Sequence, residues 1–102
     1  MDGSTKQLLN EVMSDVEYQW NMHGIPTKLR NLSVKYNKRA TKLNVKLIDI
    51  IRSDDRFICK TNPNTGGWFI APLKGIDETF SDVEDINERE KMISTYWDHA
   101  AK

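Results

Sequence analysis

Basic side chains gather in the middle of this sequence, where they have the chemistry to contact a polyanion. Residues 23–61 hold ten lysines and arginines against three acids, a net charge of +7, whereas residues 1–22 carry −3 and residues 62–102 carry −4. Cationic side chains bind phosphate groups, and amide side chains hydrogen-bond to phosphates or base edges. The residues that could form such a surface are Lys28, Arg30, Lys35, Lys38, Arg39, Lys42, Asn44, Lys46, Lys60, Asn62 and Asn64. The same segregation is equally expected if the acidic flanks fold back and neutralise the basic middle.

Groups that would perform catalysis or hold a metal do not converge in the sequence. His23 and His99 stand near opposite ends, and the His-x-x-x-His and paired-cysteine spacings of zinc sites do not occur. Cys59 falls in an apolar stretch, where we expect a buried small hydrophobe rather than a nucleophile. No phosphate loop, dinucleotide fingerprint or nucleophile elbow is present. We therefore expect a protein that is not an enzyme and has no metal, cofactor or small-molecule substrate.

Length and composition allow one small domain. The chain has 102 residues, of which 38% are hydrophobic, and its net charge is +0. No apolar run approaches the roughly 18 residues of a membrane span. Residues 1–10 are polar and lack the apolar core of a signal peptide, and one cysteine agrees with a reducing compartment. These features predict a nuclear or cytoplasmic protein with no membrane partner.

The first part of the chain predicts two helices. Apolar side chains recur at spacings of three and four from Leu8 to Trp20, which lines one face of a helix that Gly24 should end. A second, shorter helix is predicted to begin at Thr27, because apolar residues continue at helical spacing as far as Tyr36.

Residues 37–53 predict a turn followed by a third helix. The polar residues 37–40 interrupt the apolar pattern and are interpreted as a turn. A helix is then expected from Thr41, with Leu43, Leu47 and Ile50 on one face. Lys42 would lie on the opposite, solvent-facing side of this helix, together with Lys46 and Asn44 as candidates for base or phosphate contact.

The remaining sequence predicts a β-hairpin and a last helix. Residues 57–61 and 68–71 are β-branched and aromatic, and residues 62–67 between them are dense in turn formers. An irregular connector should run from Pro72 to about Phe80, and a capping-box pattern at Ser81 and Glu84 opens the last helix. Residues 1–80 are thus predicted to form one domain, and residues 81–102 a C-terminal helix that packs on or beside it.

The order helix, helix, helix, hairpin over residues 5–72 resembles the winged-helix form of the helix-turn-helix superfamily. In this interpretation Ile25-Pro26 supplies a small first strand, the second and third helices form the turn unit, and residues 62–67 are the wing. The predicted fold class is α+β, a winged helix with a three-helix core, a β-hairpin wing and an extra C-terminal helix.

Three winged-helix families are similar in part. The winged-helix domain of the Kin17 family looks similar at Thr27-Lys28, at Tyr36-Asn37 and at residues 67–70. Asn44 matches an asparagine that Z-nucleic-acid-binding domains carry on their third helix. LOTUS domains share the layout, and that likeness implies a protein or RNA partner.

The leading hypothesis is a DNA- or RNA-binding domain that uses the third helix and the basic turn, with the wing assisting. The alternative is a protein-interaction winged helix that docks a partner or dimerises through aromatic and acidic surface. The basic side chains would then form an ordinary solvated surface, and Asn62 and Asn64 would serve only as turn formers. Trp68 and Phe69 alternate across a strand, so only one of them can face the core, and we expect Trp68 to be packed rather than a stacking platform.

Overall fold

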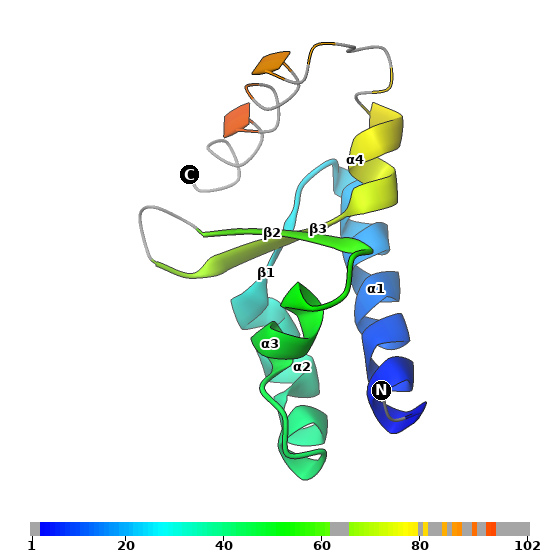
Figure 1. Ribbon diagram of the computed structural model, residues 1–102, viewed down its shortest axis with the longest axis vertical. Coiled ribbons are helices and arrows are strands. Elements are labelled where there is room, and N and C mark those ends of the chain that lie inside the picture. Colours follow the sequence, from blue (N-terminus) through cyan, green and yellow to red (C-terminus); the bar gives the residue numbers. More distant parts are fainter. Residues whose placement is uncertain are drawn as a thin grey trace.

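The computed structural model describes residues 3–61 and 66–79, together with Ser81, Asp85, Asn87, Glu88, Lys91, Ser94 and Thr95. Its elements, in chain order, are α1 (Gly3–His23), β1 (Thr27–Lys28), α2 (Leu29–Lys42), α3 (Leu47–Arg52), β2 (Phe57–Thr61), β3 (Trp68–Pro72) and α4 (Leu73–Thr79). The strands form one antiparallel sheet in the order β1-β3-β2. The sheet crosses the molecule, with α2 and α3 on one side of it and α1 alongside (Figure 1). The predicted α+β class is confirmed.

The long helix α1 supplies the largest share of the core. Its buried apolar side chains are Leu8, Leu9, Val12, Met13, Val16 and Trp20, the stripe that the sequence pattern predicted. The helix ends as predicted at Gly24, whose φ of +67° is a left-handed conformation that glycine adopts without steric cost. The Gly24 N–H donates a hydrogen bond of 2.9 Å to the carbonyl oxygen of Trp20, which satisfies the last turn.

The helix α2 is longer than predicted, and α3 is shorter. Residues 37–40 are helical rather than a turn, because Ala40 is fully buried one turn beyond the buried Tyr36. The turn lies instead at residues 43–46, where Asn44 has a φ of 58°. Asparagine tolerates this conformation, which ends α2. The prediction that the third helix starts at Thr41 is therefore wrong.

The predicted hairpin is confirmed, and the small first strand is displaced. Strands β2 and β3 pair in a register that places Thr61 opposite Trp68. Strand β1 begins at Thr27, beyond the predicted Ile25-Pro26, since proline has no N–H to donate to a sheet. Phe69 is fully buried, whereas Trp68 is half-buried. The wing residues Asn62 and Asn64 lie outside the described residues.

Residues predicted to form an irregular connector fold as α4, which is anchored on α1. The Trp20 indole N–H donates to Thr79 Oγ1 at 3.2 Å, and the Leu73 N–H donates to the carbonyl oxygen of Arg56 at 2.9 Å. A Cβ at Gly75 would lie 2.6 Å from Cδ1 of Trp20, so only glycine permits this close approach. The helix predicted for residues 81–102 falls mostly outside the described residues. Within this range, the described residues in helical conformation are Asn87, Glu88, Lys91, Ser94 and Thr95.

Candidate nucleic-acid interface

Four of the predicted contact residues form one stripe along α2. Lys35, Lys38, Arg39 and Lys42 follow the spacing i, i+3, i+4 and i+7, which brings side chains onto one side of a helix. The sequence analysis places Lys35 in the second predicted helix, Lys38 and Arg39 in the turn, and Lys42 in the third predicted helix. Because α2 continues without a break to Lys42, the structure joins them on one surface.

Half of this stripe is neutralised by acids of α1. Lys35 Nζ lies 2.9 Å from Asp15 Oδ2, and Arg39 Nη2 lies 2.5 Å from Glu11 Oε2. The hydrogen bond to Asp15 raises the pKa of Lys35, and the hydrogen bond from Arg39 lowers the pKa of Glu11, so each shift favours the charged form of its group. Lys35 and Arg39 therefore fit the alternative hypothesis, in which an acidic flank folds back and neutralises the basic middle of the chain.

The buried Tyr36 side chain on α2 adds hydrogen bonds to the same part of α1. Its hydroxyl lies 2.6 Å from Asp15 Oδ2 and 3.2 Å from the carbonyl oxygen of Glu11, and its side chain is buried. Burial raises the pKa of the Tyr36 phenol, and the hydrogen bond to Asp15 adds to the increase. The α1–α2 contact is therefore a hydrogen-bonded network in which Lys35 and Arg39 stabilise the fold.

Other predicted cations have no acidic partner within the described residues. Lys38, Lys42 and Lys46 are exposed, and the structure gives them no ion pair there. Lys38 and Lys42 are one turn apart on α2, and Lys46 is the N-cap residue of α3, across the turn that contains Asn44. Lys42, Asn44 and Lys46 thus surround the α2–α3 turn, rather than lying along the third helix as predicted.

Lys28 and Lys60 belong to a different part of the surface. Lys28 on β1 and Lys60 on β2 each lie directly opposite Phe69 on the central strand β3, so the two lysines flank Phe69 in the sheet. Residues directly opposite in an antiparallel sheet point to the same face. Phe69 alternates with Ile70, which belongs to the main core, so the two lysines share the sheet face that points away from that core. Arg30, grouped with Lys28 in the sequence analysis, is an exposed residue of the first turn of α2.

One basic residue that sequence reasoning did not select joins α3 to the hairpin. The guanidinium carbon of Arg52 lies 4.8 Å from the centre of the Trp68 ring, a cation–π arrangement. Arg52 is exposed at the end of α3, and Trp68 begins β3. The basic charge of Arg52 was visible in the sequence, but its aromatic partner lies 16 positions away and is brought near only by the tertiary fold.

Cys59 lies near this contact and is unsuited to nucleophilic chemistry at neutral pH. Burial raises the pKa of its thiol to about 11, although the charge of Arg52 opposes the increase. In the described part of the chain, no group of three or more histidine, cysteine or acidic side chains is placed to hold a metal ion. No helix in that part is both long enough and apolar enough to cross a membrane.

Comparison with known proteins adds no relative. No family model matches the chain, and neither the curated proteins nor the solved structures gave a significant match.

Proposed function

We propose that this chain is a winged-helix domain that binds nucleic acid without catalysis, using the exposed cations around the α2–α3 turn. The observation that carries the proposal is that Lys38, Lys42 and Lys46 are exposed and have no acidic partner among the described residues. Charges that a fold leaves without an internal partner are available to neutralise the phosphates of a ligand.

The order of the elements supports the winged-helix part of the proposal. Three helices and a small first strand precede a two-stranded hairpin, and the first strand pairs with the second strand of that hairpin. In helix-turn-helix proteins the second helix of the unit approaches the major groove. That helix is α3 in this chain, and Lys46 stands at its start.

The short length of α3 sets the kind of binding that we propose. Its six residues span about 9 Å, so few side chains can reach base edges. Asp49 is exposed in its first turn and repels phosphate. Affinity should therefore come mainly from phosphate contacts by the lysines, with limited reading of sequence by Asn44.

Charge reversal tests this proposal. Lys42→Glu and Lys46→Glu should each weaken binding to labelled duplex DNA or RNA roughly tenfold at low salt, because each removes one phosphate contact and adds a repulsion. The matched control is Lys74→Glu, which makes the same change on α4 and should leave affinity within about twofold. Equal effects of all three variants would mean that net charge alone governs binding and would overturn the proposed surface.

A further inference from the structure

A groove separate from the basic surface lies between α1, α4 and the segment just before β2. Its volume is about 530 Å³, and the described apolar residues that line it are Met13, Pro72 and Leu73. A smaller hollow of about 100 Å³ shares Glu17, Pro72 and Lys74 with this groove. The two hollows therefore share walls formed by residues of α1 and α4.

The rim of the groove is acidic. The acids that line it are Glu17, Asp55, Asp77 and Glu78. Two cations, Arg56 and Lys74, also line it. Arg56 is already engaged, since its Nη2 lies 2.7 Å from Asp54 Oδ2 and its Nη1 donates to Asn10 Oδ1 at 2.9 Å. Among the described residues that line the groove, acids therefore outnumber cations.

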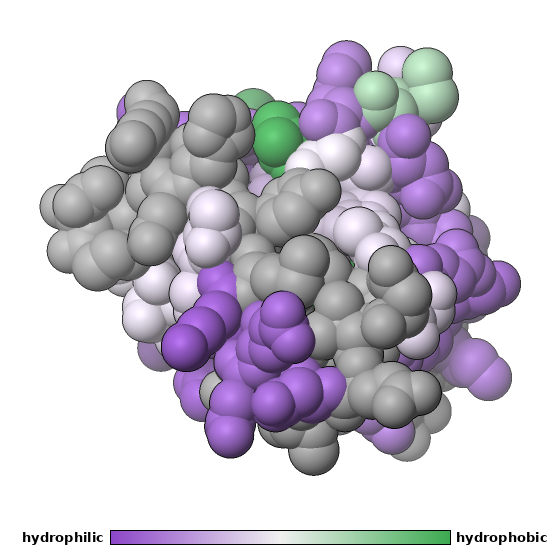
Figure 2. All heavy atoms as spheres, turned by 90° about the horizontal axis from the view of Figure 1, so that it is seen from above, coloured by the Kyte–Doolittle hydropathy of each residue, from purple (hydrophilic) through white to green (hydrophobic). Residues whose placement is uncertain are grey.

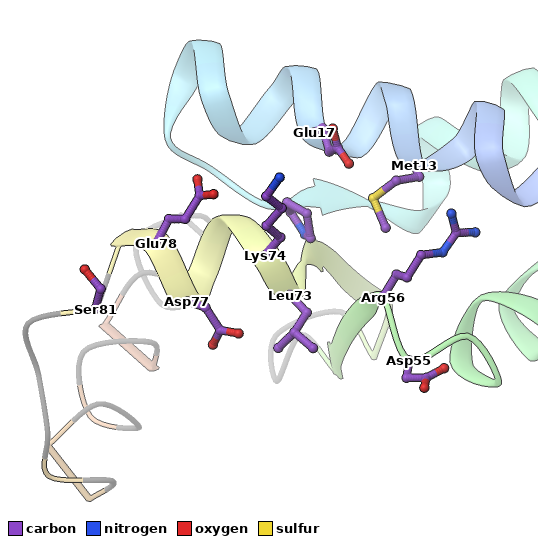
Figure 3. Close-up of a pocket in the computed structure, with 10 residues that line it drawn as sticks. Met13, Glu17, Asp55, Arg56, Leu73, Lys74, Asp77, Glu78 and Ser81 are labelled. Carbon is purple, nitrogen blue, oxygen red and sulfur yellow. The ribbon is translucent and has the colours of Figure 1, made fainter.

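Leu73 gives the groove an accessible apolar side chain. It is 37% exposed, whereas Met13 beside it is nearly buried. Seen from the α4 end of the molecule, the described residues are mostly hydrophilic or intermediate in hydropathy, with hydrophobic residues in small patches (Figure 2). Leu73 and Asp77 project from one side of α4, and Lys74 and Glu78 project from the side toward α1 (Figure 3).

The walls of the groove are held in place by contacts already formed. The hydrogen bond from Trp20 to Thr79 and the close packing at Gly75 fix α4 on α1. A preformed groove binds a ligand without the cost of ordering its own walls. Its position also separates it from the proposed nucleic-acid surface, since α4 and the α2–α3 turn lie at opposite ends of the molecule (Figure 1).

We propose that this groove docks a basic amphipathic segment of a partner protein. An apolar side chain of the segment would pack against Met13, Pro72 and Leu73, and flanking lysines or arginines would pair with the acidic rim. Charge complementarity selects this occupant, because the same rim repels nucleic acid and acidic peptides. The inference does not depend on nucleic-acid binding, so either activity can fail without the other.

The test uses a synthetic helical peptide of leucine and lysine, about 14 residues or four turns long, with leucines on one face. One matched peptide has glutamate for every lysine, and another has serine for every leucine. We expect the basic apolar peptide alone to bind at micromolar concentration, with amide NMR shifts centred on residues 72–78. Leu73→Ser and Glu78→Gln should each weaken binding about threefold or more. Val34→Ser removes an apolar side chain that is 87% exposed on α2 and should have no effect.

Several outcomes would overturn the proposal. Equal binding of the acidic peptide would remove the electrostatic argument, and shifts centred on α2 would place the site elsewhere. Self-association of the protein that is lost in Leu73→Ser would assign the groove to a second copy of the chain. Displacement of the peptide by duplex DNA from the residues 72–78 would show that the groove belongs to a nucleic-acid surface.

Discussion

Arg52, the last residue of α3, lies with its guanidinium carbon 4.8 Å from the centre of the Trp68 ring, at the start of β3. This contact joins the short helix of the proposed nucleic-acid surface to the hairpin. It links two residues that neither share an element nor follow each other in sequence. The relative position of helix and hairpin is therefore partly fixed by one cation–π interaction.

A double-mutant cycle measures this contact. Arg52→Met keeps an unbranched, apolar stem and removes the guanidinium charge, and should lower the free energy of unfolding by about 0.5–1 kcal/mol. The same change in a Trp68→Leu background should cost almost nothing, because the aromatic partner is gone. Urea unfolding of the four proteins gives the coupling energy, and a coupling of zero would show that the two side chains are merely adjacent.

Tyr36 is predicted to stabilise the α1–α2 contact through its hydroxyl. Tyr36→Phe removes the 2.6 Å hydrogen bond to Asp15 and should cost about 1–2 kcal/mol of unfolding free energy. The control is Tyr18→Phe, the same chemical change at a residue that is 61% exposed on α1. Equal costs at the two positions in thermal or urea unfolding would contradict the role assigned to Tyr36.

Gly75 is predicted to be required for the seating of α4 on Trp20. Gly75→Ala places a methyl group 2.6 Å from the buried indole ring and should destabilise the protein by about 1–3 kcal/mol. Gly3→Ala is the matched control, since no heavy atom lies within 4 Å of a Cβ added there. Calorimetry should show a lower melting temperature for the first variant alone. An unchanged melting temperature in Gly75→Ala would mean that α4 is not packed on Trp20.

The elements with a strong local pattern were predictable from sequence. The stripe from Leu8 to Trp20 fixes α1, because a long amphipathic repeat needs no tertiary information to be recognised. Strands β2 and β3 followed from a turn-rich segment between two apolar runs. The prediction of the α2–α3 boundary was wrong because Leu43, four residues before Leu47, has the apolar spacing of a helix that continues across the turn. Asn44 was the available signal, since asparagine favours the left-handed conformation that ends a helix.

Other features depend on tertiary contacts and were outside the reach of sequence patterns. The short helix α4 has seven residues and contains Gly75, so its local propensity is weak, and it is held by Trp20. Of the candidate site, the basic character of residues 28–46 was visible in the sequence. The capture of Lys35 and Arg39 by acids of α1 was not, because those ion pairs join residues 20 and 28 positions apart.

Cys59 gives a prediction about pH. Burial disfavours the thiolate and raises the pKa of the Cys59 thiol to about 11 in the folded protein, from an ordinary value of 9.0. The unfolded chain therefore loses this proton at lower pH than the folded protein. Stability contributed by the protonated thiol is complete below about pH 9 and is lost as the pH rises toward 11. Cys59→Ala should show a smaller decrease in unfolding free energy over this range than the wild-type protein.

Thiol labelling checks the same assignment directly. A maleimide or disulfide reagent should modify native Cys59 slowly at neutral pH and rapidly after unfolding in urea. Rapid labelling of the native protein at neutral pH would contradict the partial burial of the Cys59 thiol.

The most direct test of nucleic-acid binding is a fluorescence-anisotropy titration of labelled duplex DNA, duplex RNA and single strands at two salt concentrations. If Lys38, Lys42 and Lys46 neutralise about three phosphates, duplex DNA affinity should fall roughly 40-fold between about 50 and 200 mM salt. The strand type bound most tightly then defines the class of ligand. Absence of binding to every strand type at the lower salt concentration would contradict the proposed function.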